Sequence, residues 1–188
     1  MFKDGNSMAF DLLFDKYRLP VYNFAWRMLD GDRTAAEDLL QNVFIKIAGA
    51  KDYYEPQSKF STWLFTIARN HCLNFLKSRN SVQKRNTMSL DATVEDCGSS
   101  LADRLPATKE AHKTVEQNET IRILEKNIHA LPEKYKELFL LHAVEGLSHE
   151  EIATILKTNA ATVRTNYRRA RLFLLEKIKP FLNAEGSI

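Results

Sequence analysis

The residues of this chain that can do chemistry are mainly cations and aromatic rings, and one group of them lies near the carboxyl terminus. Between Lys157 and Lys179 there are seven basic residues and a single acidic one, Glu176. Charges on a helix that merely faces water usually alternate in sign, so this one-sided distribution predicts a surface that binds a polyanion such as nucleic acid. The seven are Lys157, Arg164, Arg168, Arg169, Arg171, Lys177 and Lys179.

A second group lies between Lys59 and Asn80, where a basic stripe accompanies aromatic side chains. Ser61 can cap a helix that continues without Gly or Pro to about Ser78. Single-stranded nucleic acid requires cations for its phosphates and flat rings for its unstacked bases. Taken alone, the stretch fits a core helix with an ordinary solvated face better than a binding helix. The mostly polar stripe consists of Thr62, Thr66, Arg69, Asn70, Leu73 and Lys77.

The sequence shows no arrangement typical of an enzyme active site. His142 and His149 are seven residues apart with a turn between them, and the other histidines are scattered, so we expect no metal site. Cys72 is expected to pack inside its helix, and Cys97 has no local activating group. There is no glycine-rich phosphate loop, nucleophile elbow or acid–base pair. We therefore expect a protein that is not an enzyme, with no catalytic residue and no cofactor.

Helices must position these two groups. Few strand-like alternations, six glycines and many segments with a 3.6-residue period predict an all-α fold. Apolar periodicity disappears between about Ser81 and Lys109, where Ser, Thr, Asn and Asp dominate. We therefore predict two small helical domains joined by a flexible linker, with the first domain at 1–80, the linker at 81–110 and the second domain at 111–188.

Composition narrows the class of protein. A chain with 44% hydrophobic and 27% charged residues is typical of a soluble globular protein. The net charge of +3 is too small for a globally basic nucleic-acid binder, so any DNA-binding surface is local. The apolar run Leu138–Leu141 is far too short to span a bilayer, the amino end does not resemble a signal peptide, and two cysteines suit a reducing compartment. We expect a cytoplasmic protein without membrane insertion.

Several residues predict where helices begin and end. Capping boxes, in which two side chains satisfy the free N–H groups of a helix start, are predicted at Thr34–Glu37 and Ser148–Glu151. Asn159 is expected to cap the last helix, which should stop before Pro180. Pro20 is expected to break or kink the first helix, because proline lacks a backbone N–H.

The segment Leu147–Ile178 has the layout of a helix-turn-helix. A short first helix braces a second one, whose amino-terminal residues can enter the major groove of DNA. The arginines of this second helix can bind phosphates, or they can reach guanine edges, and the sequence does not distinguish the two. The expected buried side comprises Val163, Tyr167, Ala170 and Leu174, and the exposed side comprises Arg164, Thr165, Arg168 and Arg171.

Taken together, these motifs resemble the bacterial RNA polymerase sigma factors of the extracytoplasmic-function (ECF) subfamily over nearly the whole chain. Ala36–Phe44 is similar to the family's polymerase-binding helix, and Phe60–Asn70 resembles its promoter-melting segment. The family's reader of the upstream promoter element is matched by Leu131-Pro132, Gly146–Ser148, Glu151–Ala153, Thr162-Val163 and Arg169–Arg171. A lone helix-turn-helix is weak evidence, whereas several motifs in the right order are strong.

The resemblance implies a role for each site. The first domain is expected to dock on the clamp of the largest polymerase subunit through Asp38, Gln41, Asn42 and Ile45. The minus-ten element would be recognised and melted by Glu55, Gln57, Ser58, Lys59, Trp63, Thr66, Arg69, Asn70 and Lys77. The second domain would sit on the flap of the second-largest subunit and read the minus-thirty-five element through Asn159, Ala161, Thr162, Arg164, Thr165, Arg168 and Arg171. An anti-sigma partner and a monomeric free protein are also implied.

The chain departs from the family pattern at four positions, and two other functions compete with this interpretation. Asn74, Lys157, Ala161 and Asn166 replace the residues commonly found there, and Lys157 stands at the usual glycine of the turn. One alternative is a helix-turn-helix repressor or activator whose first domain senses a ligand or dimerises, which would bind a palindrome tightly when free. The other is an anti-sigma-bound adaptor that acts by protein contact alone.

Overall fold

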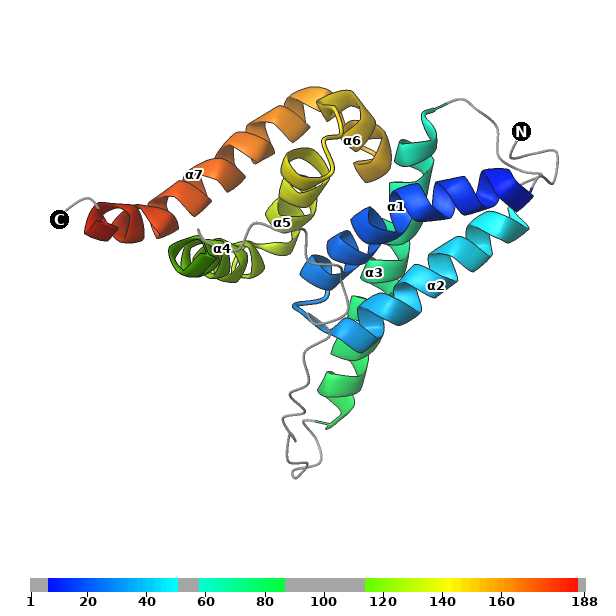
Figure 1. Ribbon diagram of the computed structural model, residues 1–188, viewed down its shortest axis with the longest axis horizontal. Helices are drawn as coiled ribbons and strands as arrows, with labels where there is room; N and C mark the ends of the chain where they lie inside the picture. The colour runs from blue at the N-terminus through cyan, green and yellow to red at the C-terminus, as the bar shows by residue number, and fades with distance from the viewer. Residues whose placement is uncertain (1–6, 51–57, 87–113, 186–188) are drawn as a thin grey trace.

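The computed structural model describes residues 7–50, 58–86 and 114–185, and within these ranges the chain is helical without strands. The first half contains α1 (Ser7–Met28), α2 (Arg33–Gly49) and α3 (Phe60–Asn86). The second half contains α4 (Thr114–His129), α5 (Glu133–Phe139), the π-helical turn η3 (Leu140–Val144), α6 (His149–Leu156) and α7 (Ala160–Glu185). Figure 1 shows the two groups as separate bundles that lie side by side. The predicted all-α fold is confirmed. None of the described helices is long and apolar enough to cross a membrane.

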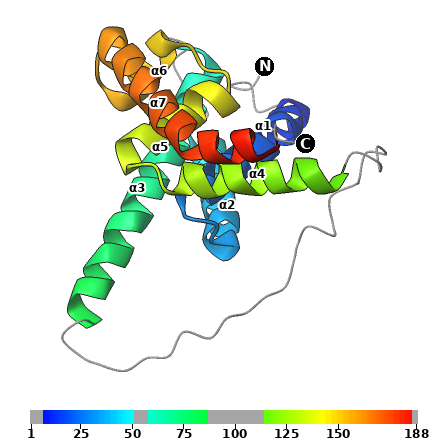
Figure 2. The same cartoon turned by 90° about the vertical axis from the view of Figure 1, so that its left-hand side faces the viewer.

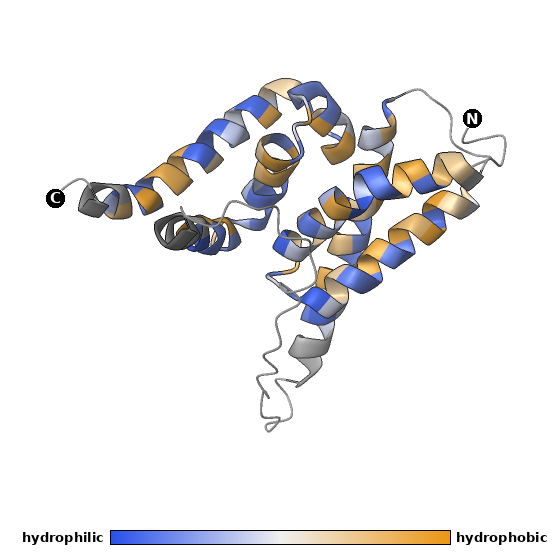
Figure 3. Ribbon diagram, viewed as in Figure 1, coloured by the Kyte–Doolittle hydropathy of each residue, from blue (hydrophilic) through white to orange (hydrophobic). Residues whose placement is uncertain are grey.

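Buried apolar side chains hold the helices of each half together. In the first half, α1 packs along α2 and both contact α3, and the rings of Phe24 and Phe65 meet edge to face with centroids 5.6 Å apart. In the second half, α7 packs against α4, α5 and α6, and Leu141, Ile152 and Val163 are fully buried. Figure 3 shows the apolar positions of the helices alternating with polar ones. The helical period read from the sequence therefore corresponds to buried faces in both halves.

The two halves also contact each other, which the sequence did not predict. α6 packs directly on α3, and α4 and α5 contact α1. Buried apolar residues of the two halves belong to one continuous cluster. In the side view of Figure 2, α4 and α7 run next to each other, while the far end of α3 projects away from the second half.

The helix ends confirm two of the predicted caps and correct a third. Ser148 and Glu151 form the predicted capping box, and Asn159 Oδ1 accepts a hydrogen bond of 2.7 Å from the Thr162 N–H. The capping box predicted at Thr34 is wrong, because α2 begins at Arg33 and the carboxylate of Asp32 caps it by accepting from the Ala35 N–H at 3.0 Å. Because the helix begins one residue before Thr34, the cap falls to Asp32, which lies just outside it.

Pro20 and Pro180 lie inside helices, so the predicted break at Pro20 and the predicted stop before Pro180 are wrong. α1 runs through Pro20 to Met28, and α7 runs through Pro180 to Glu185. Proline removes one backbone hydrogen bond, but its φ is compatible with a helix. α1 packs along α2, and α7 packs along α4, and both helices continue past the proline despite the missing hydrogen bond. α3 likewise extends beyond the predicted end near Ser78 to Asn86.

Candidate nucleic-acid and polymerase interfaces

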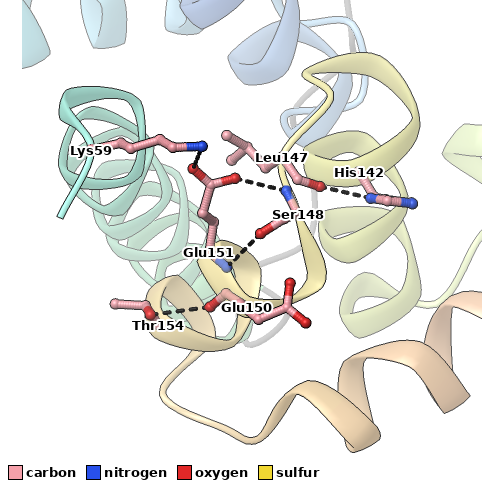
Figure 4. Close-up of polar contacts among 7 residues, drawn as sticks. All are labelled: Lys59, His142, Leu147, Ser148, Glu150, Glu151 and Thr154. Atoms are coloured by element: carbon pink, nitrogen blue, oxygen red, sulfur yellow. Dashed lines mark hydrogen bonds and ion pairs between the residues drawn. The ribbon is translucent and has the colours of Figure 1, made fainter.

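The turn between α6 and α7 fixes the geometry of the helix-turn-helix. Lys157 has φ 52° and ψ 48°, so at the usual glycine position of the turn it adopts the left-handed conformation that glycine favours. Its backbone N–H donates to the Ala153 and Thr154 carbonyls, which closes α6. The caps at Ser148, drawn in Figure 4, and at Asn159 fix where α6 and α7 begin, and the turn at Lys157 joins the two helices.

α7 divides into a buried side and a basic exposed side. Val163 and Ala170 are fully buried and Leu174 is nearly so, as predicted, whereas Tyr167 is only partly buried. The residues expected to read DNA are all exposed, and Arg169 joins them on the same surface. They are Asn159, Ala161, Thr162, Arg164, Thr165, Arg168 and Arg171. In the part of the chain that the structure describes, no salt bridge joins these exposed arginines to a carboxylate, so the start of α7 is a cationic surface.

A groove of about 730 Å³ runs beside this surface, between α7 and the helices that support it. Its apolar lining includes Leu124 of α4, Phe139 of α5 and Leu175 of α7. Arg164, Arg168 and Arg171 also line it, together with Leu172, which is 55% exposed. The groove therefore combines an apolar lining with cationic side chains.

A cluster of three rings connects η3, α6 and α7. The imidazoles of His142 and His149 stack with centroids 4.3 Å apart, and the ring of Tyr167 meets His142 edge-on at 4.4 Å. His142 Nδ1 lies 2.7 Å from the Leu147 carbonyl (Figure 4). Burial, then the neighbouring His142 and Arg164, lower the pKa of His149. The sequence had placed these histidines apart. Within the described residues no group of three metal-ligating side chains forms around them.

The α3 surface differs from the expected open basic stripe. Arg69 Nε donates to Glu137 Oε1 of α5, and its Nη2 lies 3.5 Å from Glu137 Oε2. Lys59 Nζ lies 3.1 Å from Glu151 Oε1 of α6. Two of the cations expected to hold a DNA strand are therefore paired with carboxylates of the second half.

The other residues expected at the minus-ten element are distributed unevenly. Asn70 and Lys77 are exposed, and Ser58 is half-buried. Trp63 is half-buried with its ring 5.7 Å from that of Phe60. The Thr66 hydroxyl donates to the Thr62 carbonyl at 2.7 Å, and the Thr62 side chain is buried, so Thr62 is not part of an exposed stripe. Glu55 and Gln57 lie outside the described residues, as does Cys97.

The outer face of α2 carries the residues expected to bind polymerase. Asp38, Gln41, Asn42 and Ile45 are all exposed, while Leu39, Val43 and Ile47 of the same helix are buried. Ile45 is 68% exposed, so this side of the helix presents an apolar side chain to solvent. The four residues recur at three- and four-residue steps, so they share one side of the helix.

Comparison with known proteins shows which family combines these two halves. The model of sigma-70 region 2 matches residues 13–82, and that of sigma-70 region 4 matches residues 121–174. The chain is 32% identical over 181 residues to the ECF RNA polymerase sigma-E factor of Haemophilus influenzae, covering 96% of this chain and 93% of that protein. This chain belongs to the ECF RNA polymerase sigma factors. The sigma-E factor of Escherichia coli K12 is also similar, at 30% identity over 95% of this chain and 91% of its own length.

Two solved structures share the fold. The sigma factor RpoE of Bartonella quintana, in complex with the anti-sigma factor NepR, superimposes with a TM-score of 0.71 at 22% identity and covers 91% of this chain and 97% of its own. CnrH, in complex with the cytosolic domain of CnrY, gives a TM-score of 0.64 at 20% identity, covering 97% of this chain and 93% of that one. This sigma factor is thus a promoter-recognition subunit that binds RNA polymerase core and promoter DNA, and it is not an enzyme.

Sequence reasoning missed the acidic residues of the sigma factor that face α3. Glu137 has a side chain only 7% exposed, and Lys136 next to it is 8% exposed. The sequence carried only a weak indication of their burial, because charged residues on an amphipathic helix normally face solvent. Only the contact between the two halves explains their burial.

Proposed function

We propose that the exposed start of α7 reads the minus-thirty-five promoter element. The observation that carries this proposal is the cationic surface formed by Arg164, Arg168 and Arg171 opposite the buried Val163 and Ala170. A recognition helix contacts base edges with its amino-terminal residues, so Asn159, Thr162 and Thr165 are the polar candidates beside these arginines. Phosphate contacts position the helix, and a bidentate contact to a base discriminates by roughly 1–3 kcal/mol.

The exposed side of α3, with the loop before it, is proposed to hold the separated strand of the minus-ten element. Asn70 and Lys77 are exposed there, and Trp63 offers part of a ring. Arg69 and Lys59 would add phosphate contacts once they leave Glu137 and Glu151. Extruding a base costs a few kcal/mol, which stacking on aromatic rings and hydrogen bonds to its edge recover.

Two further surfaces are proposed to contact polymerase. The outer face of α2, with the exposed Ile45 at its centre, would dock on the clamp of the largest subunit. The apolar groove between α4 and α7 would receive a segment of the flap of the second-largest subunit. The apolar side chains exposed at both places support this assignment, because contact with a partner would remove them from water.

We also propose that the protein is cytoplasmic, monomeric when free and regulated by an anti-sigma factor. The sigma factor RpoE of Bartonella quintana forms such a complex with the anti-sigma factor NepR, which motivates the last part. The boundaries 1–80, 81–110 and 111–188 remain our proposal for the domains of this chain.

Reconstitution with core polymerase tests the residue roles. Arg168→Ala is expected to weaken promoter binding by roughly 1–3 kcal/mol if the side chain reads a base, and to reduce the salt dependence if it binds phosphate. Lys179→Ala is the matched control, because it removes an exposed cation from the same helix about 16 Å farther along, at 1.5 Å per residue. Equal effects of both changes would count against a reading face at the start of α7.

A further inference from the structure

One stripe of α7 changes from cationic to apolar along the helix. Arg164, Arg168 and Arg171 recur at steps of four and three residues, so they share one side of α7. The same steps continue to Leu175 and Ile178, which extend the stripe towards the carboxyl end of the helix. All five residues line the groove of about 730 Å³. The groove therefore has a cationic end and an apolar end.

The wall that faces α7 adds apolar surface to the groove. Leu124 of α4 and Phe139 of α5 line it, and α4 runs next to α7 in Figure 2. Leu172 and Leu175 of α7 are 55% and 56% exposed, so both side chains meet water in the free protein. Removing such surface from water is favourable, so the apolar end of the groove can accept a hydrocarbon chain.

The length of the apolar part matches one acyl chain. A helix rises about 1.5 Å per residue, so Ile178 lies about 15 Å beyond Arg168 along α7. The hydrocarbon core of a bilayer is about 30 Å thick, so each of its two layers of acyl chains is about 15 Å deep. A ligand whose head group lies at Arg168 would therefore lay a single chain along the groove as far as Ile178.

The cationic end favours a carboxylate as the head group. Arg164, Arg168 and Arg171 are exposed, and a guanidinium can give a carboxylate two parallel N–H donors. His149 lines the same groove, and its buried Nε2 has no hydrogen-bond partner among the described residues. With a proton on Nε2, His149 would gain an acceptor from such a head group. A cationic head group would be repelled from the same place.

We propose that the groove along α7 binds a fatty acid, with its carboxylate at the three arginines and its acyl chain along the leucines and Ile178. This ligand would cover the arginines proposed to read the minus-thirty-five element and the apolar lining proposed to receive the flap segment. That consequence rests on the proposed function, whereas the binding of the fatty acid does not. A free fatty acid would thus act as an inhibitory ligand of the sigma factor.

Titration calorimetry of the free full-length chain with laurate, kept below its critical micelle concentration, tests the site. We expect saturable binding of one laurate, which Leu175→Glu should weaken at least about tenfold by placing a carboxylate beside the chain. Leu12→Glu, at a leucine of α1 that is 68% exposed, is the matched control and should bind laurate normally. Leu172→Glu replaces Leu175→Glu if circular dichroism shows that the latter does not fold.

The head group and the chain are tested separately. Arg168→Ala with Arg171→Ala should weaken laurate binding about tenfold, because charge-assisted hydrogen bonds are lost, and Lys179→Ala should leave it unchanged. Each methylene removed from the ligand should weaken binding by up to about fourfold. Dodecyltrimethylammonium, which has the same chain and a cationic head, should bind at least about tenfold more weakly than laurate.

Three results would overturn the fatty-acid site. The first is the absence of saturable laurate binding. The second is equal affinity for laurate and dodecyltrimethylammonium, or equal losses in the groove variants and their controls, because either would show unspecific adsorption of a detergent. The third is binding to phosphatidylglycerol vesicles without binding of monomeric laurate, which would show a membrane-surface site instead.

Transcription separates a failure of this site from a failure of the proposed function. Sigma factor incubated with laurate before core polymerase is added should give less promoter-dependent transcript. The laurate concentration that halves transcription should rise in Leu175→Glu in proportion to its Kd. If laurate binds in the groove but transcription is unchanged, the site stands and the proposed role of this surface in transcription has failed. If laurate does not bind while Arg168→Ala weakens promoter binding, the site is wrong and the proposed function stands.

Discussion

Replacing Ser148 by Ala should weaken the helix-turn-helix by a predictable amount. Ser148 Oγ accepts a hydrogen bond of 3.2 Å from the Glu151 N–H, and this bond is lost in the variant. The returning bond from the Ser148 N–H to Glu151 Oε2 uses only the backbone of residue 148, so it can persist. Loss of a serine cap costs typically about 1 kcal/mol. For a chain of this size, the melting temperature should fall by roughly 2–4 °C.

Thermal denaturation followed by circular dichroism measures this effect, with Thr154→Ala as the control. The Thr154 hydroxyl is exposed and donates to the Glu150 carbonyl of its own helix at 3.1 Å, a contact that contributes little to helix stability. Ser148→Ala should also reduce binding to minus-thirty-five duplex by the holoenzyme, because α6 supports α7. A loss no larger than that of Thr154→Ala would refute the reasoning that this capping box holds the first helix in place.

Four other predictions follow from the described residues. Ile45→Ala should weaken binding to core polymerase in a pull-down titration, whereas Leu12→Ala, equally exposed at 68%, should not; equal losses would contradict a specific α2 interface. Cys72 is buried and burial raises the pKa of its thiol to about 12, so an alkylating reagent should label it only after unfolding, and rapid labelling in the native state would contradict the core packing. Burial raises the pKa of Glu145 to about 7, with Arg27 opposing the shift; Lys16, Lys59 and Glu151 line the same cavity between the two halves. Because the folded chain favours the protonated carboxyl, this contribution to stability should be greatest at acidic pH and be lost as pH rises through about 7; a Glu145→Gln variant with the same pH dependence in chemical denaturation would exclude Glu145 as its source. The pKa of His149 is lowered by burial, so stability of the second half should fall as pH drops below about 6.5, and His149→Gln should lose that dependence in acid-denaturation curves.

Local chemistry in the sequence predicted the second half well. The capping box at Ser148, the cap at Asn159 and the buried positions of α7 depend on contacts within a few residues, which spacing alone reveals. The exposed α2 residues followed in the same way from the helical period. Where two residues compete for one role, as Asp32 and Thr34 do at the start of α2, spacing could not decide between them.

Interactions between distant parts of the chain were not predictable. Arg69 and Glu137 are 68 positions apart, and nothing near either residue indicates that they meet. The same holds for the stacked rings of His142 and His149, which approach only because η3 and α6 pack against α7. The continuation of α1 and α7 through proline likewise depends on neighbouring helices rather than on local sequence.

Transcription by polymerase core reconstituted with this sigma factor, on a promoter carrying its own minus-ten and minus-thirty-five elements, tests the central claim most directly. We expect promoter-dependent transcript and an open minus-ten region with the intact chain, a reduction of both with Arg164→Ala plus Arg168→Ala, and near-normal levels with Lys179→Ala. Unchanged transcription in the double arginine variant would contradict the assignment of promoter reading to the start of α7.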